Sequence, residues 1–415
     1  KGLLSIMPDI KKSILYIVSA LFFSSNVQAV DGTFDLGESL FDPSEKFFSK
    51  QKSPFVFELS GGYIQNYNPL LVDGLDGSLI SAVGKGNLVT KQEAYWFEAK
   101  YLGLTNKYTL SDSDVAVDDS FSTFDLGINN RFFLAGNFSV DLNARHTQFD
   151  EQIGTGISKF RPNIAKADQG VISQASVSLA YGADPIYRSI VLTHAVTDRD
   201  YKDVNAYSNL FDLEQSVTSL YTNFRLSDLT QLISLIEYRR LTYGTAQTLD
   251  SDFYKILTGV EWQPGGKSKV LALIGWYKRK YDLVEDTSGI NWEFAADYFP
   301  REDLALSINS QRRSTSGDNS ERAFDTIEQD TELEIIYRYS EQWLWGVSYL
   351  HRTTDFESLL GSRSTQESNI GAHSRLILKN HSYVELLIGS SRIQDDEIFT
   401  DYKQTRVNLS WNYEF

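Results

Sequence analysis

The last ten residues of the chain alternate strictly between apolar and polar side chains. The apolar ones are Val407, Leu409, Trp411, Tyr413 and Phe415, with a polar residue between each pair. Successive side chains of a β-strand point to opposite faces, whereas an α-helix repeats every 3.6 residues, so this pattern predicts a strand. Segments with the same alternation recur through most of the chain after residue 54. The sequence therefore predicts an all-β protein.

The connections between these segments alternate between short and long. Tight turns are expected at sites such as Ala135–Gly136, Gln263–Gly266 and Asn380–His381. Longer polar loops are expected at Gly154–Asp168, Lys202–Asp212, Asp282–Ser288, Ser314–Phe324, Ser358–Arg363 and Gln394–Thr400. A β-sandwich gives no reason for this order, whereas outer-membrane barrels combine short periplasmic turns with longer external loops. The pattern favours a barrel whose strands are half lipid-facing and half water-facing.

Parity then predicts the number of strands. The C-terminal strand is expected to end in the periplasm, and hairpins counted back from Phe415 make Phe121–Phe133 a downward strand. Three strands must precede it, and Phe55–Gln65, Ser78–Thr90 and Glu93–Tyr108 supply them. We predict a transmembrane antiparallel up-and-down β-barrel of about 18 strands over residues 54–415, in the outer membrane of a Gram-negative bacterium.

The beginning of the chain has the features of a secretory signal peptide. Lys11 and Lys12 precede an apolar run, Ile14–Phe23, and small residues lead to Ala29. The run is too short to cross a bilayer as a helix, so we expect residues 1–29 to be a signal peptide cleaved after Ala29. Met7 is the only methionine and the expected start. Residues 30–53 are predicted to form a periplasmic N-terminal segment.

Composition excludes several classes of function. The chain has 39 Lys and Arg against 55 Asp and Glu, so nucleic acid is not an expected partner. It has no Cys, which excludes disulfides, thiolate metal sites and cysteine nucleophiles. Its five His are dispersed and form no metal-binding motif. We therefore predict no metal, no cofactor and no enzymatic activity.

The polar face of the alternating segments carries charges of both signs. We expect these residues to line the lumen of the barrel. They are Glu98, Lys100, Asp125, Arg131, Asp141, Arg145, Lys255, Glu261, Glu293, Asp297, Glu332, Glu334, Arg338, Arg375, Glu385 and Arg406. Because the two signs are roughly balanced, strong ion selectivity is not predicted.

Short basic runs recur at the expected outer ends of the upward strands. The predicted members of this outer-rim collar are Arg199, Arg240, Lys278, Arg279, Lys280, Arg312, Arg313, Arg352 and Arg392. Such a collar could guide an acidic polymer or bind the phosphates of lipopolysaccharide. Alternatively, ion pairs with adjacent Asp and Glu hold the rim rigid.

The end of the chain is expected to direct assembly. Trp411, Tyr413 and Phe415 form a predicted C-terminal barrel-assembly signal. Partners expected on this interpretation are the barrel-assembly machinery, outer-membrane lipid and lipopolysaccharide.

Several short runs resemble the β-barrel porin 2 family of outer-membrane proteins. They are Thr197–Asp203, Leu235–Arg240, Leu257–Trp262, Ser288–Glu293 and Ser307–Thr315. Members of this family are often associated with exopolysaccharide synthesis and export. The resemblance implies a conduit for a polysaccharide cargo that works with a periplasmic polysaccharide-export protein. Residues 30–52 would then contact that partner or plug the mouth of the barrel.

Three functions are consistent with the sequence. The first is a channel that exports exopolysaccharide or capsular polysaccharide to the cell surface. The second is a general diffusion or nutrient porin. The third is a filled barrel that acts as a surface adhesion or assembly protein.

Overall fold

The fold is taken from a computed structural model. It describes residues 55–67, 75–92, 94–110, 120–134, 137–151, 157, 166–182, 188–202, 205, 207–316, 324–358, 361–378, 382–395 and 402–414. The predicted signal peptide, the N-terminal segment 30–53 and Phe415 lie outside these residues. No helix among the described residues is long and apolar enough to cross a membrane.

The described chain forms one antiparallel sheet of 18 strands, which confirms the predicted fold class. The strands are β1 Phe55–Tyr67, β2 Leu75–Gln92, β3 Tyr95–Leu110, β4 Ser120–Leu134, β5 Phe138–Glu151, β6 Asp168–Tyr181, β7 Arg188–Tyr201, β8 Leu213–Ser227, β9 Thr230–Tyr243, β10 Ser251–Trp262, β11 Ser268–Tyr281, β12 Thr287–Arg301, β13 Leu304–Ser316, β14 Asp325–Arg338, β15 Trp343–Ser358, β16 Gly361–Ile377, β17 Ser382–Asp395 and β18 Tyr402–Glu414. The described residues also include three short 3-10 helices, namely η2 Ser208–Phe211, η3 Gln247–Leu249 and η4 Pro264–Gly266.

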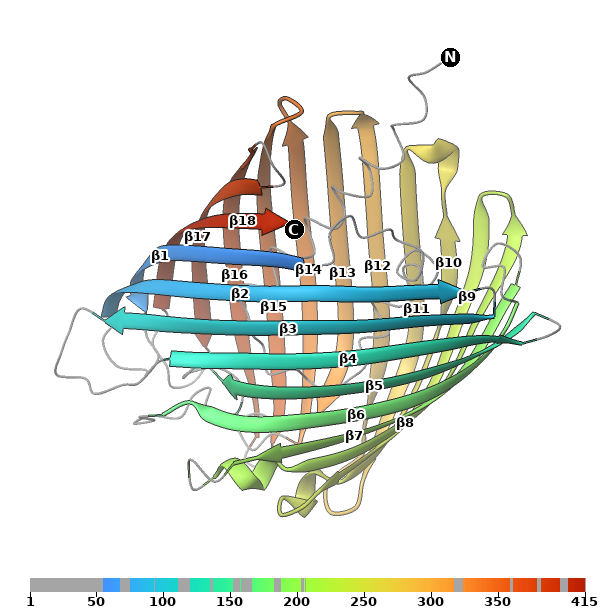
Figure 1. The fold of residues 1–415 in the computed structure, drawn as a ribbon. Helices are drawn as coiled ribbons and strands as arrows, with labels where there is room; N and C mark the ends of the chain where they lie inside the picture. Colours follow the sequence, from blue (N-terminus) through green and yellow to red (C-terminus); the bar gives the residue numbers. More distant parts are fainter. Residues whose placement is uncertain are drawn as a thin grey trace.

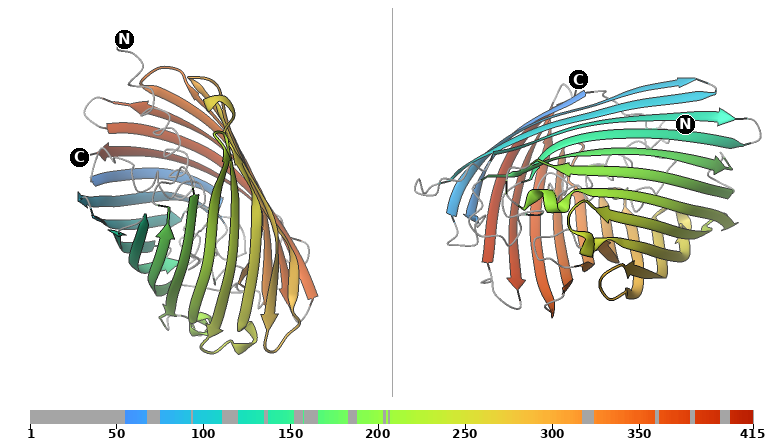
Figure 2. Two further views of the ribbon diagram at one scale, coloured as in Figure 1. Left: turned by 90° about the vertical axis from the view of Figure 1, so that its right-hand side faces the viewer. Right: turned by 90° about the horizontal axis from the view of Figure 1, so that it is seen from below.

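Each strand pairs with its neighbours in the chain, and the first and last strands close the sheet. β1 pairs with β18 from Val56↔Glu414 to Gln65↔Thr405. Figure 1 shows this seam where the blue β1 lies beside the red β18, and Figure 2 shows the single-layered wall from two further sides. Closure pairs the backbone of every strand on both sides, as a lipid-embedded sheet requires.

The two ends of the barrel differ in their connections. One end, which we call the turn end, holds the start of β1, the end of β18 and short turns. Asn137 and Gly182 adopt positive φ there, at the turn after β4 and the end of β6. Pro300 lies next to a register shift between Tyr298 and Arg301, so it interrupts no regular stretch of the ladder. The opposite end, which we call the loop end, carries most of the longer connections.

One expected loop is largely strand. The sequence predicted a loop over Ser358–Arg363, but Ser358 pairs with Gly361, and β16 begins there. Gly and Ser favour loops by composition, whereas here the backbone ladder continues through them. The strict alternation of short turns and long loops therefore fails between β15 and β16.

The outward face of the wall is apolar and exposed. Leu59, Ile80, Leu192, Ile274 and Leu409 are examples on five strands. Aromatic side chains gather on this face near the turn end, where Phe138 lies 4.9 Å from Tyr181 and Tyr95 lies 5.4 Å from Phe132, measured between ring centroids. Aromatic girdles of this kind favour the interface between lipid and water.

Candidate functional site: the inner wall of the barrel

Strand pairing defines which residues face inward. On β9, β10 and β11 the odd-numbered residues oppose one another and lie on the face away from the exposed apolar side chains. Applied to every strand, the same register places all sixteen of the predicted lumen-lining residues on the inward face. That these residues line an open lumen remains a proposal.

Ion pairs between neighbouring strands join many of these residues. Arg145 Nε lies 2.7 Å from Asp125 Oδ1, and the hydroxyl of Thr147 donates to the same oxygen. Glu98 accepts from Asn87 and Asn129. On the far side of the seam, Arg375 donates to both carboxylate oxygens of Glu385 at 3.1 and 3.2 Å. Further pairs between strands are Arg131–Asp141 and Lys269–Glu261, and Lys100 pairs with Glu98 within β3.

A buried triad on β9 and β10 was missed by the sequence analysis. Glu237 lies between two cations, with Arg239 Nη2 2.8 Å from Oε1 and Lys255 Nζ 3.1 Å from Oε2. The guanidinium of Arg239 also lies 5.5 Å from the ring of Phe253. Only Lys255 was predicted. Apolar residues occur at both odd and even positions of β9, so the face of Glu237 depends on the pairing with β10.

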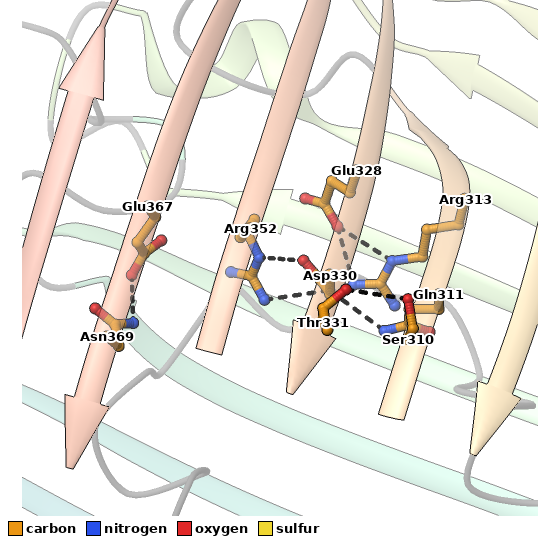
Figure 3. Close-up of polar contacts among 9 residues, drawn as sticks. All are labelled: Ser310, Gln311, Arg313, Glu328, Asp330, Thr331, Arg352, Glu367 and Asn369. Carbon is orange, nitrogen blue, oxygen red and sulfur yellow. Dashed lines mark hydrogen bonds and ion pairs between the residues drawn. The ribbon is translucent and has the colours of Figure 1, made fainter. Parts of the chain in front are cut away.

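A second network joins the inward faces of β13, β14 and β15 (Figure 3). Arg352 Nε donates to Asp330 Oδ1 at 2.7 Å, and Gln311 donates to the other oxygen of Asp330 at 3.3 Å. Arg313 donates to Glu328 from two nitrogens, at 2.9 and 3.1 Å. The guanidinium groups and carboxylates therefore alternate along the wall.

The inward face also has an apolar patch. Ile233, Leu235, Leu257, Leu271 and Leu273, on β9 to β11, are 0–5% exposed. Tyr221 and Ala295 pack against them. In a fully hydrated barrel, apolar side chains on the inner face would be partly exposed to water. These five are not, so this part of the inner wall is shielded from water.

The predicted basic collar is not one ring. Lys278 and Arg279 are consecutive in a strand, so they lie on opposite faces. The register places four members inward and five outward. The inward ones are Arg199, Arg279, Arg313 and Arg352, and the outward ones are Arg240, Lys278, Lys280, Arg312 and Arg392. The inward members are engaged within the protein, as when Arg199 donates to the carbonyl oxygen of Phe211.

Parts of the loop end pack onto the inner wall. Ile157 and Phe211, from two connections, join Phe149, Ile172 and Tyr201 in an apolar cluster. Helix η2 is held by Asp168, whose carboxylate accepts hydrogen bonds from Asn205, Tyr207 and Ser208 at 2.6–2.9 Å. A similar cluster joins η3 to β8 and β9 through Leu213, Leu241, Tyr243 and Leu249. These contacts fix the connections on the β5 to β9 side.

Other predicted features are also located. At the turn end, the ring of Trp411 lies 6.5 Å from Phe57 across the seam and 6.0 Å from Tyr413. Across the described part of the chain, no group of three or more His, Asp or Glu is placed to hold a metal ion.

Among known proteins, the chain is similar in fold to several solved structures. No family model matches the chain, so membership of the β-barrel porin 2 family stays a prediction, and no curated protein matches it. A BenF-like porin from Pseudomonas fluorescens is 12% identical, with a TM-score of 0.49, over 88% of this chain and 99% of that one. OpdK from Pseudomonas aeruginosa is 11% identical, with a TM-score of 0.48, over 87% and 98%. The FrpB iron transporter of Neisseria meningitidis is 10% identical, with a TM-score of 0.46, over 89% and 82%.

The faces of the wall place this barrel in a membrane independently of those likenesses. A closed antiparallel barrel with an apolar exterior, aromatic residues at its turn end and charges inside is the architecture of outer-membrane proteins. The protein is an outer-membrane β-barrel of a Gram-negative bacterium.

Proposed function

We propose that the barrel is a water-filled channel through which small hydrophilic solutes diffuse passively. One observation supports this most directly. The side chains of Lys100, Arg145 and Arg313 point inward and form ion pairs, yet they are 50%, 42% and 38% exposed. A barrel packed through its whole width would cover them. Space for water therefore lies beside β3, β5 and β13.

The inner wall suits small solutes of mixed character. Carboxylates, guanidinium groups, amides and hydroxyls alternate along it, and most charges are paired within the wall. Fixed pairs of this kind offer hydrogen bonds to a passing solute without a strong net field. The general porin is thus the function that the geometry supports best.

Reconstitution tests this proposal. The refolded protein should give stepwise ion conductance in planar bilayers, and liposomes that contain it should swell in small sugars faster than in large oligosaccharides. A heat-unfolded sample is the control. A folded barrel that gives neither conductance nor swelling would overturn the proposal.

A partly filled barrel is the second candidate, because the apolar patch on β9 to β11 is shielded. The proposed filling is the segment 30–52, which precedes β1 and contains Phe34, Phe41 and Phe47. Deleting residues 30–52 should then raise the conductance. An unchanged conductance would reject this filling.

Polysaccharide export is implied by the resemblance alone and stays a prediction. A gene deletion that lowers surface polymer would support it, and a deletion strain with normal surface polymer would contradict it. The proposed periplasmic partner would be sought by crosslinking to residues 30–52.

A further inference from the structure

Three carboxylates gather on the inward face of β12 and β14. Ser307 of β13 pairs with Asp297 on one side and with Glu334 on the other. The next inward residue of β13, Asn309, pairs with Glu332. Since adjacent strands lie about 4.8 Å apart, the backbones at Asp297 and Glu334 are about 10 Å apart across Ser307. We call these three residues the acidic cluster.

Among the residues that the structure describes, none forms an ion pair with Glu334. Its residue is 4% exposed, and neither carboxylate oxygen has a hydrogen-bond partner among the residues that the structure describes. The hydroxyl of Ser307 lies between the two strands but donates to Asp297, at 2.8 Å. A shielded carboxylate without a donor is unfavourable, so this position is suited to a bound cation.

Each cation on the neighbouring strands also pairs with a group outside the acidic cluster. Figure 3 shows Arg352 on Asp330 and Arg313 on Glu328. Lys269 of β11 is opposite Asp297 in the register and lies 3.4 Å from Glu261, so the two carboxylates share it, and Arg338 donates to the carbonyl oxygen of Glu302. The three carboxylates of the acidic cluster therefore outnumber the two cations, Lys269 and Arg352, which they share with Glu261 and Asp330.

We propose that the acidic cluster is a binding site for organic cations that carry two or more ammonium groups, such as linear polyamines. A single metal ion needs oxygens within about 2.0–2.6 Å, whereas the carboxylates of Asp297 and Glu334 come from strands separated by β13. A linear polyamine places ammonium groups several ångströms apart along a narrow chain. Each ammonium has three donors and can make charge-assisted hydrogen bonds to one carboxylate. Ser307 and Asn309 offer further polar contacts between them.

This inference deepens the proposed function, because a channel with such a site would admit polyamines selectively. Binding and conduction are nevertheless separable. Spermidine is the probe, and its binding to the detergent-solubilised, full-length folded protein is measured by isothermal titration calorimetry at low ionic strength. Block of the ion current by spermidine is measured in planar bilayers as a second readout.

The wild type should bind spermidine, and Glu334→Gln should weaken binding at least tenfold. Glu332→Gln, at a half-buried position that folding tolerates more easily, should weaken it about threefold. Glu285→Gln, on an exposed connection at the loop end, removes the same charge and should leave binding unchanged. Each variant is folded if its unheated sample migrates faster on a gel than its boiled sample.

The outcomes separate the two proposals. Binding that depends on Glu334, without conductance, would support the site and overturn the channel. Conductance with no spermidine binding, or with binding unchanged in both Glu334→Gln and Glu332→Gln, would overturn the site and leave the channel standing. Equal weakening by Glu285→Gln would show only a general response to net charge and would also overturn the site.

Discussion

Arg131 and Asp141 meet end to end on paired strands, with Nε of Arg131 2.5 Å from Oδ1 of Asp141 and Nη2 2.8 Å from Oδ2. The two residues are directly opposite in the register of β4 and β5. A two-pronged contact of this kind fixes direction as well as distance, so it favours one register over a slipped one.

Asp141→Asn should destabilise the barrel by about 1–3 kcal/mol. The change leaves Arg131 in the wall without its counter-charge, and the cost lies below that of a fully buried pair because both side chains keep some contact with solvent. Urea unfolding of the refolded protein measures it. Asp228→Asn is the matched control, since Asp228 pairs with Arg225 but is 93% exposed, and it should change stability by about 0.5 kcal/mol or less. Equal effects of the two changes would contradict the prediction.

An arginine introduced on the outward face should destabilise the barrel more than an arginine introduced at the next position, which faces inward. Leu192 of β7 is exposed on the lipid face, and Thr193 is half-buried on the inward face between Ser178 and Ser219. Leu192→Arg should destabilise the barrel by about 2–4 kcal/mol, as Arg does near the bilayer midplane. Thr193→Arg should cost about 1 kcal/mol or less. Folding titrations in lipid vesicles measure both, and a larger cost for Thr193→Arg would refute the assigned faces.

Asp168→Ala should release helix η2 from the wall. Three donors lose their acceptor, and the hydroxyl of Ser208 is fully buried, so the local cost is about 1–3 kcal/mol. Limited proteolysis should cut residues 202–212 at least tenfold faster than in the wild type. The barrel should keep its resistance to unfolding, because the backbone ladder of β6 is untouched. Asp200→Ala, at an exposed outward position, is the control, and an unchanged cutting rate in Asp168→Ala would contradict the anchoring role.

The connection between η2 and β8 should become less stable as pH rises from acid toward neutrality. Burial raises the pKa of the Asp212 carboxyl, although the backbone N–H of Tyr201 donates to it at 2.7 Å and acts in the opposite direction. A raised pKa means that the folded connection holds the proton more tightly than the unfolded one. Its stability is therefore fully present below the ordinary carboxyl pKa and falls as pH rises through the raised value.

Asp212→Asn should remove this dependence, because the amide oxygen still accepts from Tyr201 and carries no charge. Hydrogen exchange of residues 207–213, followed from pH 4 to pH 7, measures the effect after correction for the intrinsic exchange rate. Protection in the variant should stay level where that of the wild type falls. A wild type whose corrected protection rises with pH would show the opposite sign and reject the explanation.

The strand number and the faces of most strands could be predicted from the sequence. A period of two survives in each strand because one side meets lipid and the other does not, and Leu409 beside Ser410 shows this directly. Parity then required 18 strands once the C-terminal strand was oriented. Both arguments use only local pattern and chain order.

Contacts across strands could not be predicted in the same way. The pair Arg145 and Asp125 joins residues 20 positions apart, and its existence depends on the register of β4 and β5. The basic collar is divided between two faces for a related reason, since a run such as Lys278, Arg279 and Lys280 is continuous in sequence but alternates between the inward and outward faces. Likewise, the inward direction of Glu237 follows only from the pairing of β9 with β10.

The seam between β1 and β18 has a consequence for biogenesis. Most strand pairs join residues that are close in the chain, but Val56 must find Glu414, the most distant partner in the described sheet. The cylinder cannot close until the final strand has been synthesised, and until then β1 and β17 each present an unsatisfied edge. Barrel closure thus depends on the last hairpin. A polypeptide truncated before β18 should remain an open sheet, which depends on a chaperone because its unpaired edges cannot be embedded in the membrane.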